Sequence, residues 1–196
     1  MNKDIIIIGG GVVGCAVARL LSRYDASVAV LEGGSDVAEG ASKANSGIVH
    51  AGFDAKPGSL KAKLNVEGAN MYKELCAEVN APYARPGAMV LAFTEEERPT
   101  IEKLYEQGIA NGVPELRIIE RDEIVAMEPA VNPDVVCALL VPTSGLTSPY
   151  ELTCAWPIMR LSMAWSSCVR PLSTKSSPLR AAMCWIPARA KCPRAS

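Results

Sequence analysis

A glycine-rich turn between an apolar strand and a helix constrains the fold of this chain more than any other feature. The glycines are Gly9, Gly11 and Gly14, in a G-x-G-x-x-G pattern. They follow the β-branched run 5–8, and apolar residues then recur with helical spacing over 13–21. A second apolar run, 27–31, ends at Glu32. This order predicts a βαβ unit with parallel strands buried on both faces, and therefore an α/β fold.

Each part of this unit suits the binding of a dinucleotide. Gly9 would make the tight turn, Gly11 would let the backbone approach a pyrophosphate, and Gly14 would let the helix pack closely on the strand. Glu32 is placed to accept hydrogen bonds from an adenosine ribose, and its charge disfavours the 2′-phosphate of NADP. The alternative is a glycine-rich turn in an unrelated α/β protein. Cys15, in the helix, is interpreted as a small packing residue and not as a redox thiol.

A long run of small and polar residues follows Glu32, where a plain NAD-binding domain would continue to alternate strands and helices. It reads GGSDVAEGASKANSGIVHAGFDAKPG over residues 33–58. Its backbone and hydroxyl donors would suit a pyrophosphate and a ring system, although an ordinary surface loop has the same composition. The residues alone leave that choice open.

Composition indicates the number of domains and the cellular compartment of the protein. The 196 residues, 49% of them hydrophobic, are enough for one domain with a sizeable core, or for one and a half small ones. The seven cysteines include no C-x-x-C pair, so neither a disulfide framework nor a metal site is predicted. We expect no secretory signal and no transmembrane segment, and we predict a cytoplasmic protein.

The middle of the chain has recognisable helix and strand patterns. Helices are predicted over 61–80 and 94–109, and strands over 88–93, 116–119 and 135–141. Leu64, Met71, Leu75 and Val79 are expected on a buried stripe of the first helix. Thr94 and Glu97 predict a capping box for the second. A further helix should open at Pro149.

From Asp4 to about Ala155 the chain resembles the N-terminal part of FAD-dependent oxidoreductases of the D-amino-acid-oxidase superfamily. It is most similar there to glycerol-3-phosphate dehydrogenases and L-2-hydroxyglutarate oxidases. The resemblance is carried by IIIIGGGVVG, VLEGG, GASKANSGIVHAGFD, KAKLNVEGANMYKELCAEVN, PGAMVLAFTEEE, IIERDEIVAMEPAV and VPTSGLTSPYELT. It implies FAD as cofactor, a Rossmann-like FAD/NAD(P)-binding domain and the start of a mixed-sheet substrate domain. The implied segments are 1–80 for the first domain, 81–147 for part of the second, and 148–155 for the return to the first.

The resemblance also implies roles for individual residues. Gly9, Gly11, Gly14 and Glu32 match the ADP-binding positions, and Ser42, Lys43, Asn45, Ser46 and Gly47 match the stretch that passes the pyrophosphate and flavin. His50, the single histidine of the chain, matches a histidine near the isoalloxazine. It would orient or deprotonate an alcohol during hydride transfer, or it would be a structural histidine bonded to backbone beside the cofactor. Arg85 would anchor an anionic substrate or be an exposed charge.

The implied activity is hydride transfer to FAD from a small hydroxy acid or polyol phosphate, such as 2-hydroxyglutarate or glycerol 3-phosphate. The electrons would pass to a quinone, to oxygen or to a partner subunit. Two alternatives remain. The chain could be a non-catalytic ADP- or FAD-binding fragment, or it could be a NAD-dependent dehydrogenase, which the run after Glu32 disfavours.

The tail, residues 156–196, differs in composition from the rest. It holds all three Trp and five of the 14 Pro, and it has a charge of +7 with no acidic residue, against −8 for the rest. Pro157 would disrupt a helix begun at Pro149, and no regular period follows. Moving the reading frame one base earlier permits L-A-D-N-A-x-x-N-G-V-E, a helix with an Asn-Gly exit and the start of a strand. We therefore predict a truncated chain with an irregular, frameshifted tail and no nucleic-acid partner. The alternative, a basic nucleic-acid arm, has only scattered charges.

Overall fold

The computed structural model describes residues 3–158 and 182–186, which form two compact units. Of these residues, unit 1 comprises 3–46, 78–82, 148–158 and 182–186, and unit 2 comprises 47–77 and 83–147. These compact units divide the chain differently from the segments expected from the sequence, because 47–77 joins 83–147. The domain roles of those segments stay predictions.

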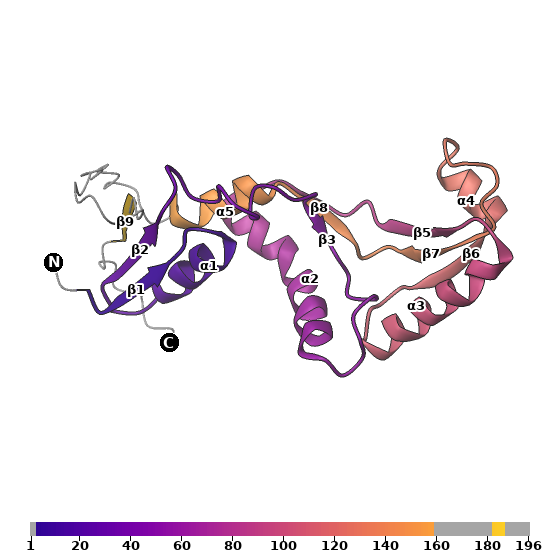
Figure 1. Ribbon diagram of the computed structural model, residues 1–196, viewed down its shortest axis with the longest axis horizontal. Coiled ribbons are helices and arrows are strands. Elements are labelled where there is room, and N and C mark those ends of the chain that lie inside the picture. The colour runs from indigo at the N-terminus through magenta and orange to yellow at the C-terminus, as the bar shows by residue number, and fades with distance from the viewer. Residues whose placement is uncertain (1–2, 159–181, 187–196) are drawn as a thin grey trace, which may run out of the picture. The chain divides into compact units, whose positions relative to one another are not determined.

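Unit 1 is built on the predicted βαβ unit, which the structure confirms. Its elements are β1 (Ile5–Ile8), α1 (Val12–Leu21) and β2 (Val28–Glu32). The strands are parallel, with Ile5 opposite Val28 and Ile8 opposite Leu31. Figure 1 shows α1 beside this pair, and its buried Ala18 packs with Val30 and Ile7. The α/β class is therefore confirmed.

The expectation that β1 is buried on both faces is wrong. Ile6 is 57% and Ile8 87% exposed, while Ile5 and Ile7 are half-buried. Only one face of β1 is covered by α1 in the described part of the chain, so alternate residues of the strand stay outside. The apolar residues of α1 divide in the same way. Cys15 and Ala18 are buried, whereas Val13, Val17 and Leu20 are exposed.

The C-terminal part of unit 1 contains two elements. Helix α5 (Pro149–Ile158) begins as predicted and includes Pro157. Strand β9 (Ala182–Ile186) lies antiparallel to β2. The expected irregular tail therefore does not hold for these five residues, whose apolar sequence AMCWI pairs with the free edge of β2. Residues 156–158 of the predicted out-of-frame tail also belong to α5, and the remainder of that tail lies outside the described residues.

Unit 2 contains a three-stranded antiparallel sheet covered by helices. The strands are β5 (Ala88–Ala92), β6 (Arg117–Glu120) and β7 (Cys137–Val141), in the order β5-β7-β6. The helices are most of α2 (Leu60–Val79), α3 (Arg98–Ala110), α4 (Arg121–Met127) and the short 3-10 helix η1 (Glu95–Glu97). Figure 1 shows α3 running along β6 and β7. A second sheet joins β3 (Ile48–Val49), β8 (Gly145–Thr147) and β4 (Tyr83–Ala84), in that order.

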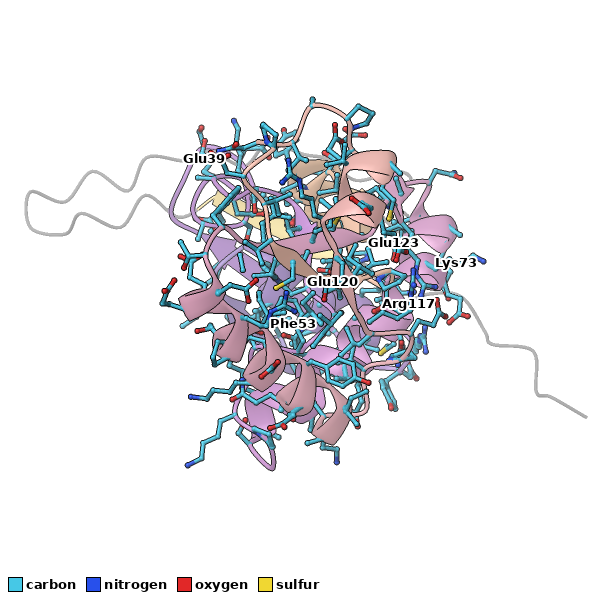
Figure 2. All side chains as sticks on the ribbon, turned by 90° about the vertical axis from the view of Figure 1, so that its right-hand side faces the viewer. Glu39, Phe53, Lys73, Arg117, Glu120 and Glu123 are labelled. Carbon is cyan, nitrogen blue, oxygen red and sulfur yellow. The ribbon has the colours of Figure 1, made fainter. Side chains whose placement is uncertain are left out.

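Charged pairs cover the outer edge of the larger sheet, at β6. The guanidinium of Arg98 donates to both carboxylate oxygens of Glu120, at 2.9 and 3.0 Å. Arg117 pairs with Glu123 of α4 at 2.8 Å (Figure 2). Such charges protect an edge strand against pairing with another chain. The three described strands of this sheet are antiparallel, because β7 runs opposite to both neighbours.

Two local predictions for unit 2 need correction. Of the stripe predicted on α2, Val79 is buried and Leu75 is half-buried, but Leu64 and Met71 are 54% and 53% exposed. Ala62 and Cys76 are buried beside Val79 on this helix. The Thr94 side chain does not cap the helix. Instead η1 takes up the expected first turn, and the Glu97 carboxylate accepts a hydrogen bond from the Phe93 N–H at 2.7 Å.

Candidate functional site

The glycine turn of unit 1 has a backbone that only glycine fits well. Gly9 has a φ of +102°, and its N–H donates to the Leu31 carbonyl at 2.7 Å. A side chain on Gly14 would collide with the Gly9 carbonyl, so α1 starts in direct contact with the end of β1. The first turn of α1 carries no acidic residue. The helix therefore offers its N–H groups and partial positive charge without a competing negative charge.

Glu32, at the end of β2, binds the same turn. Its carboxylate accepts hydrogen bonds from the Gly10 N–H at 2.6 Å and from the Gly34 N–H at 2.9 Å. The bond from Gly34, followed by that from Gly10, lowers the pKa of Glu32 below its ordinary value. An ionised carboxylate therefore lies beside the glycine turn, at the carboxyl end of both strands.

Ser42 is brought to the start of α1 although it lies 30 residues further along the chain. Its hydroxyl accepts a hydrogen bond from the Val12 N–H at 2.8 Å, and a Cβ on Gly11 would lie 3.1 Å from the same oxygen. The Asn45 amide donates to the carbonyls of Ala41 and Ser42, at 2.9 and 3.3 Å. This contact folds residues 41–45 into a compact turn at the helix start.

Lys43 and Ser46 complete the predicted set within unit 1. The Lys43 ammonium lies 5.2 Å from the ring centre of Tyr150 in α5, a cation–π distance. The Tyr150 hydroxyl faces the Asp36 carboxylate at 3.4 Å. Ser46 is exposed at the end of this part of the unit. The basic side chain is thus held beside the run that follows β2.

Gly47 and His50 belong to unit 2. Gly47 has a φ of +69°, and its carbonyl accepts a hydrogen bond from the Thr147 N–H at 2.9 Å. His50 follows β3 with an exposed side chain, and its carbonyl accepts a hydrogen bond from the Asn65 amide at 2.7 Å. The structure thus gathers the glycine turn, Glu32 and Ser42 in unit 1 and carries His50 on the other unit.

Arg85 is an exposed side chain engaged at the surface of unit 2. Its Nε donates to the Pro142 carbonyl at 3.2 Å, and its guanidinium lies 3.9 Å from the Glu115 carboxylate. These contacts match the interpretation of Arg85 as an exposed charge. Cys15 is likewise buried among packing contacts, and its thiol lies 3.3 Å from the Gly10 carbonyl.

Sequence reasoning missed three residues that contact the predicted site. Asn65 binds the main chain of His50, Asn111 binds the loop that follows it, and Tyr150 lies under Lys43. Their partners are 15, 59 and 107 positions away in the sequence, so no local spacing marks them.

In residues 3–158 and 182–186, no three or more His, Cys, Asp or Glu side chains are grouped closely enough to hold a metal ion. No helix within the same ranges is both long and apolar enough to cross a membrane.

A parallel strand pair, a glycine turn that meets the following helix, and an acid at the end of the second strand define the class of dinucleotide-binding βαβ proteins. The comparison with protein families agrees, because the family described as "FAD dependent oxidoreductase" matches residues 4–156. The chain belongs to this family.

Several characterised proteins are similar to the chain. Glycerol 3-phosphate dehydrogenase of Caloramator mitchellensis is 49% identical over 152 residues, which are 78% of this chain and 32% of that protein. Human mitochondrial L-2-hydroxyglutarate dehydrogenase is 44% identical over 128 residues, 64% of this chain and 28% of that protein. The chain thus spans about a third of the length of these relatives.

Solved structures show the same fold. L-alpha-glycerophosphate oxidase from Mycoplasma pneumoniae, with FAD bound, superposes with a TM-score of 0.74 at 33% identity. The match covers 80% of this chain and 42% of that one. Glycine oxidase from Geobacillus kaustophilus gives a TM-score of 0.72 at 27% identity, covering 79% and 43%.

Proposed function

We propose that this chain supplies the ADP-binding part of a FAD-dependent oxidoreductase. The observation that carries the proposal is the contact of the glycine turn with both α1 and Glu32. Gly14 meets the Gly9 carbonyl so closely that no side chain fits, and the Glu32 carboxylate is bound to the Gly10 N–H. An anionic pyrophosphate binds to hydrogen-bond donors, and the helix N–H groups supply them. The ribose hydroxyls need a hydrogen-bond acceptor, and the Glu32 carboxylate supplies it.

The residues present fit FAD. The ADP half would be held by Gly9, Gly11, Gly14 and Glu32, and the pyrophosphate and flavin would be passed by Ser42, Lys43, Asn45, Ser46 and Gly47. A Cβ on Gly9 would meet nothing within 4 Å, and one on Gly11 would meet only the Ser42 hydroxyl. The turn is therefore open where a phosphate would approach. When bound, FAD would supply the acceptor for a hydride from the substrate.

The proposed substrate is a small hydroxy acid or polyol phosphate, such as 2-hydroxyglutarate or glycerol 3-phosphate. Support comes from the similarity to dehydrogenases of both compounds, at 44% and 49% identity. His50, whose side chain is exposed, would take the hydroxyl proton as the hydride leaves. The electron acceptor would be a quinone, oxygen or a partner subunit.

Cofactor binding is tested by titrating the purified chain with FAD and following the flavin fluorescence. Gly11→Ala should weaken FAD binding tenfold or more, because the added methyl fills the approach beside Ser42. Gly68→Ala is the matched control, since a Cβ at Gly68 meets nothing within 4 Å and the residue lies in α2. Equal FAD affinity of the Gly11→Ala variant and the unaltered chain would contradict the proposed site.

Catalysis is tested by adding glycerol 3-phosphate or L-2-hydroxyglutarate to the FAD-loaded chain without oxygen. Loss of the flavin absorbance near about 450 nm would show hydride transfer. Retained flavin that neither compound bleaches would favour the second candidate, a non-catalytic FAD-binding fragment. That candidate is supported by the span of the chain, which covers 32% and 28% of the two relatives. A chain that binds NAD and not FAD would instead be a NAD-dependent dehydrogenase.

We also propose that residues 156–196 are translated out of frame and that the protein is cytoplasmic. The family match ends at residue 156, where the composition changes, and this supports a break at that point. The nucleotide sequence around codon 155 tests it. A frame one base earlier should stay open and encode an Asn-Gly helix exit, whereas an early stop codon would end the proposal.

A further inference from the structure

We propose that Asn65 and Asn111 are positioning residues that hold the main chain of His50. Their side-chain amides bind the segment 50–55, which begins at His50. The proposal rests on the proposed function, because it gives these amides the task of aiming the imidazole. All of the contacts involved lie within unit 2.

The segment around His50 has a buried side and an exposed side. Its inward residues are Val49, Ala51, Phe53 and Ala55, all buried. Ile48, His50 and Asp54 point outward and are exposed. Ala51 and Phe53 (labelled in Figure 2) belong to the main core of the unit. Because side chains alternate along a strand, the pairing of β3 that buries Val49 leaves Ile48 and His50 on the exposed side.

Asn65 fixes the residue itself. It lies in α2, and its Nδ2 donates to the His50 carbonyl at 2.7 Å. The neighbouring residue of the helix, Val66, fits against Gly52, where a Cβ would come within 2.8 Å of Val66 Cγ2. Gly52 has a φ of +103°, so glycine is required there for both reasons. The helix thus contacts the chain on both sides of Ala51.

Asn111 fixes the end of the segment. Its Nδ2 donates to the Gly52 carbonyl at 2.9 Å and to the Ala55 carbonyl at 2.7 Å. The amide nitrogen carries two N–H bonds, so it can serve both carbonyl acceptors at once. The Oδ1 atom is buried without a hydrogen-bond partner in the described structure.

The backbone that carries Asn111 is itself well held. Asn111 caps α3, and a Schellman motif follows it: the Gly112 N–H donates to the Ile109 carbonyl at 3.0 Å, and the Val113 N–H to the Gly108 carbonyl at 2.9 Å. A Cβ on Gly108 would lie 3.0 Å from Phe53 Cβ. The last turn of α3 therefore packs directly on segment 50–55, and the backbone that carries the Asn111 amide is held in place.

The position of the His50 main chain sets how close the imidazole can come to a substrate hydroxyl. A general base works only within hydrogen-bond distance of the proton that it takes, so a small shift of its main chain lowers its effect. The Asn65 amide bonds the His50 backbone to α2, and the Asn111 amide bonds residues 52–55 to the end of α3. Without the two asparagine amides, segment 50–55 would keep its apolar contacts but would lose the hydrogen bonds that fix its position.

The experiment uses the fact that the chain has a single histidine. The Cε1–Hε1 NMR signal of His50 is therefore unique, and its chemical shift, line width and pH titration can be followed without any flavin. Asn65→Asp and Asn111→Asp keep the side-chain size but turn an oxygen toward the carbonyl acceptors. Both variants should move or broaden the His50 signal. Asn70→Asp, exposed on the same helix as Asn65, is the matched control for the added charge and should leave it in place.

Amide signals of β5 and β7 report whether the core survives. If Asn111→Asp unfolds the unit, the milder Asn65→Ala decides the question. Unmoved His50 signals in folded Asn65 variants would overturn the proposal, as would an equal shift in Asn70→Asp. Failure of the proposed function would give a different result. The chain would then not bind FAD, while the His50 signal would still change on substitution of Asn65 or Asn111.

Discussion

At the scale of single residues, Glu32 joins the glycine turn to the loop that follows β2. Its carboxylate holds the Gly10 and Gly34 N–H groups, and these bonds lower its pKa in the folded state. A lowered pKa means that the bonds add stability above the unfolded value of about 4.3 and lose it as the pH falls through the folded pKa. Glu32→Gln should therefore cost about 1 kcal/mol at pH 7 and progressively less below about pH 4.

Urea unfolding at several pH values measures this difference. Glu74→Gln, exposed on α2, is the matched control and should change the free energy of unfolding by less than about 0.5 kcal/mol at every pH. A Glu32→Gln effect that stays constant from pH 7 to pH 3 would show that the charge of Glu32 does not stabilise the turn.

Some residues of the candidate site could be predicted from the sequence, and some of its contacts could not. Gly9, Gly14 and Glu32 could be predicted because the strand, turn and helix that place them are adjacent in the chain. The bond from Val12 to Ser42 and the contact of Asn111 with Gly52 could not, since each depends on how distant segments fold together. Local pattern thus found the turn and the acid but not the side chains that support them.

At the scale of elements, the long helices and strands followed from periodicity, whereas β3, β4 and β8 were missed. These strands have only two or three residues each, and they exist through pairing such as that of Ile48 with Leu146. The buried face of α2 was predicted only in part, because Val79 is buried as expected while Ala62 and Cys76 take the place of Leu64 and Met71. Close packing of helices selects small residues, which a search for large ones overlooks.

The end of α3 gives a prediction at this scale. Gly112 has a φ of +80°, which its place in the Schellman motif requires. Gly112→Ala should lower the free energy of unfolding by about 1 kcal/mol, since a Cβ is strained in that region. Gly68→Ala, in the interior of α2 with open space around it, should instead be neutral or stabilising by up to about 1 kcal/mol. Equal midpoints for the two variants in urea would contradict the motif's contribution.

At the scale of the whole molecule, unit 1 exposes large apolar side chains on two of its elements. Ile6 and Ile8 of β1 are exposed, as are Val13, Val17 and Leu20 of α1. Strand β1 is also an edge of the described sheet, because its order is β1-β2-β9. An exposed apolar strand with a free edge favours association with another chain. We therefore expect the protein to self-associate through β1 as its concentration rises.

The double variant Ile6→Thr/Ile8→Thr tests this expectation, because threonine keeps the β-branched shape of the strand and removes part of its apolar surface. Light scattering during gel filtration should show a larger monomer fraction than for the unaltered chain at the same concentration. Met127→Gln removes an exposed apolar side chain from unit 2 and serves as the control, which should leave the monomer fraction unchanged. If Met127→Gln raised the monomer fraction as much as the β1 variant, association would not be specific to β1. If neither variant changed it, the exposed isoleucines would not drive association.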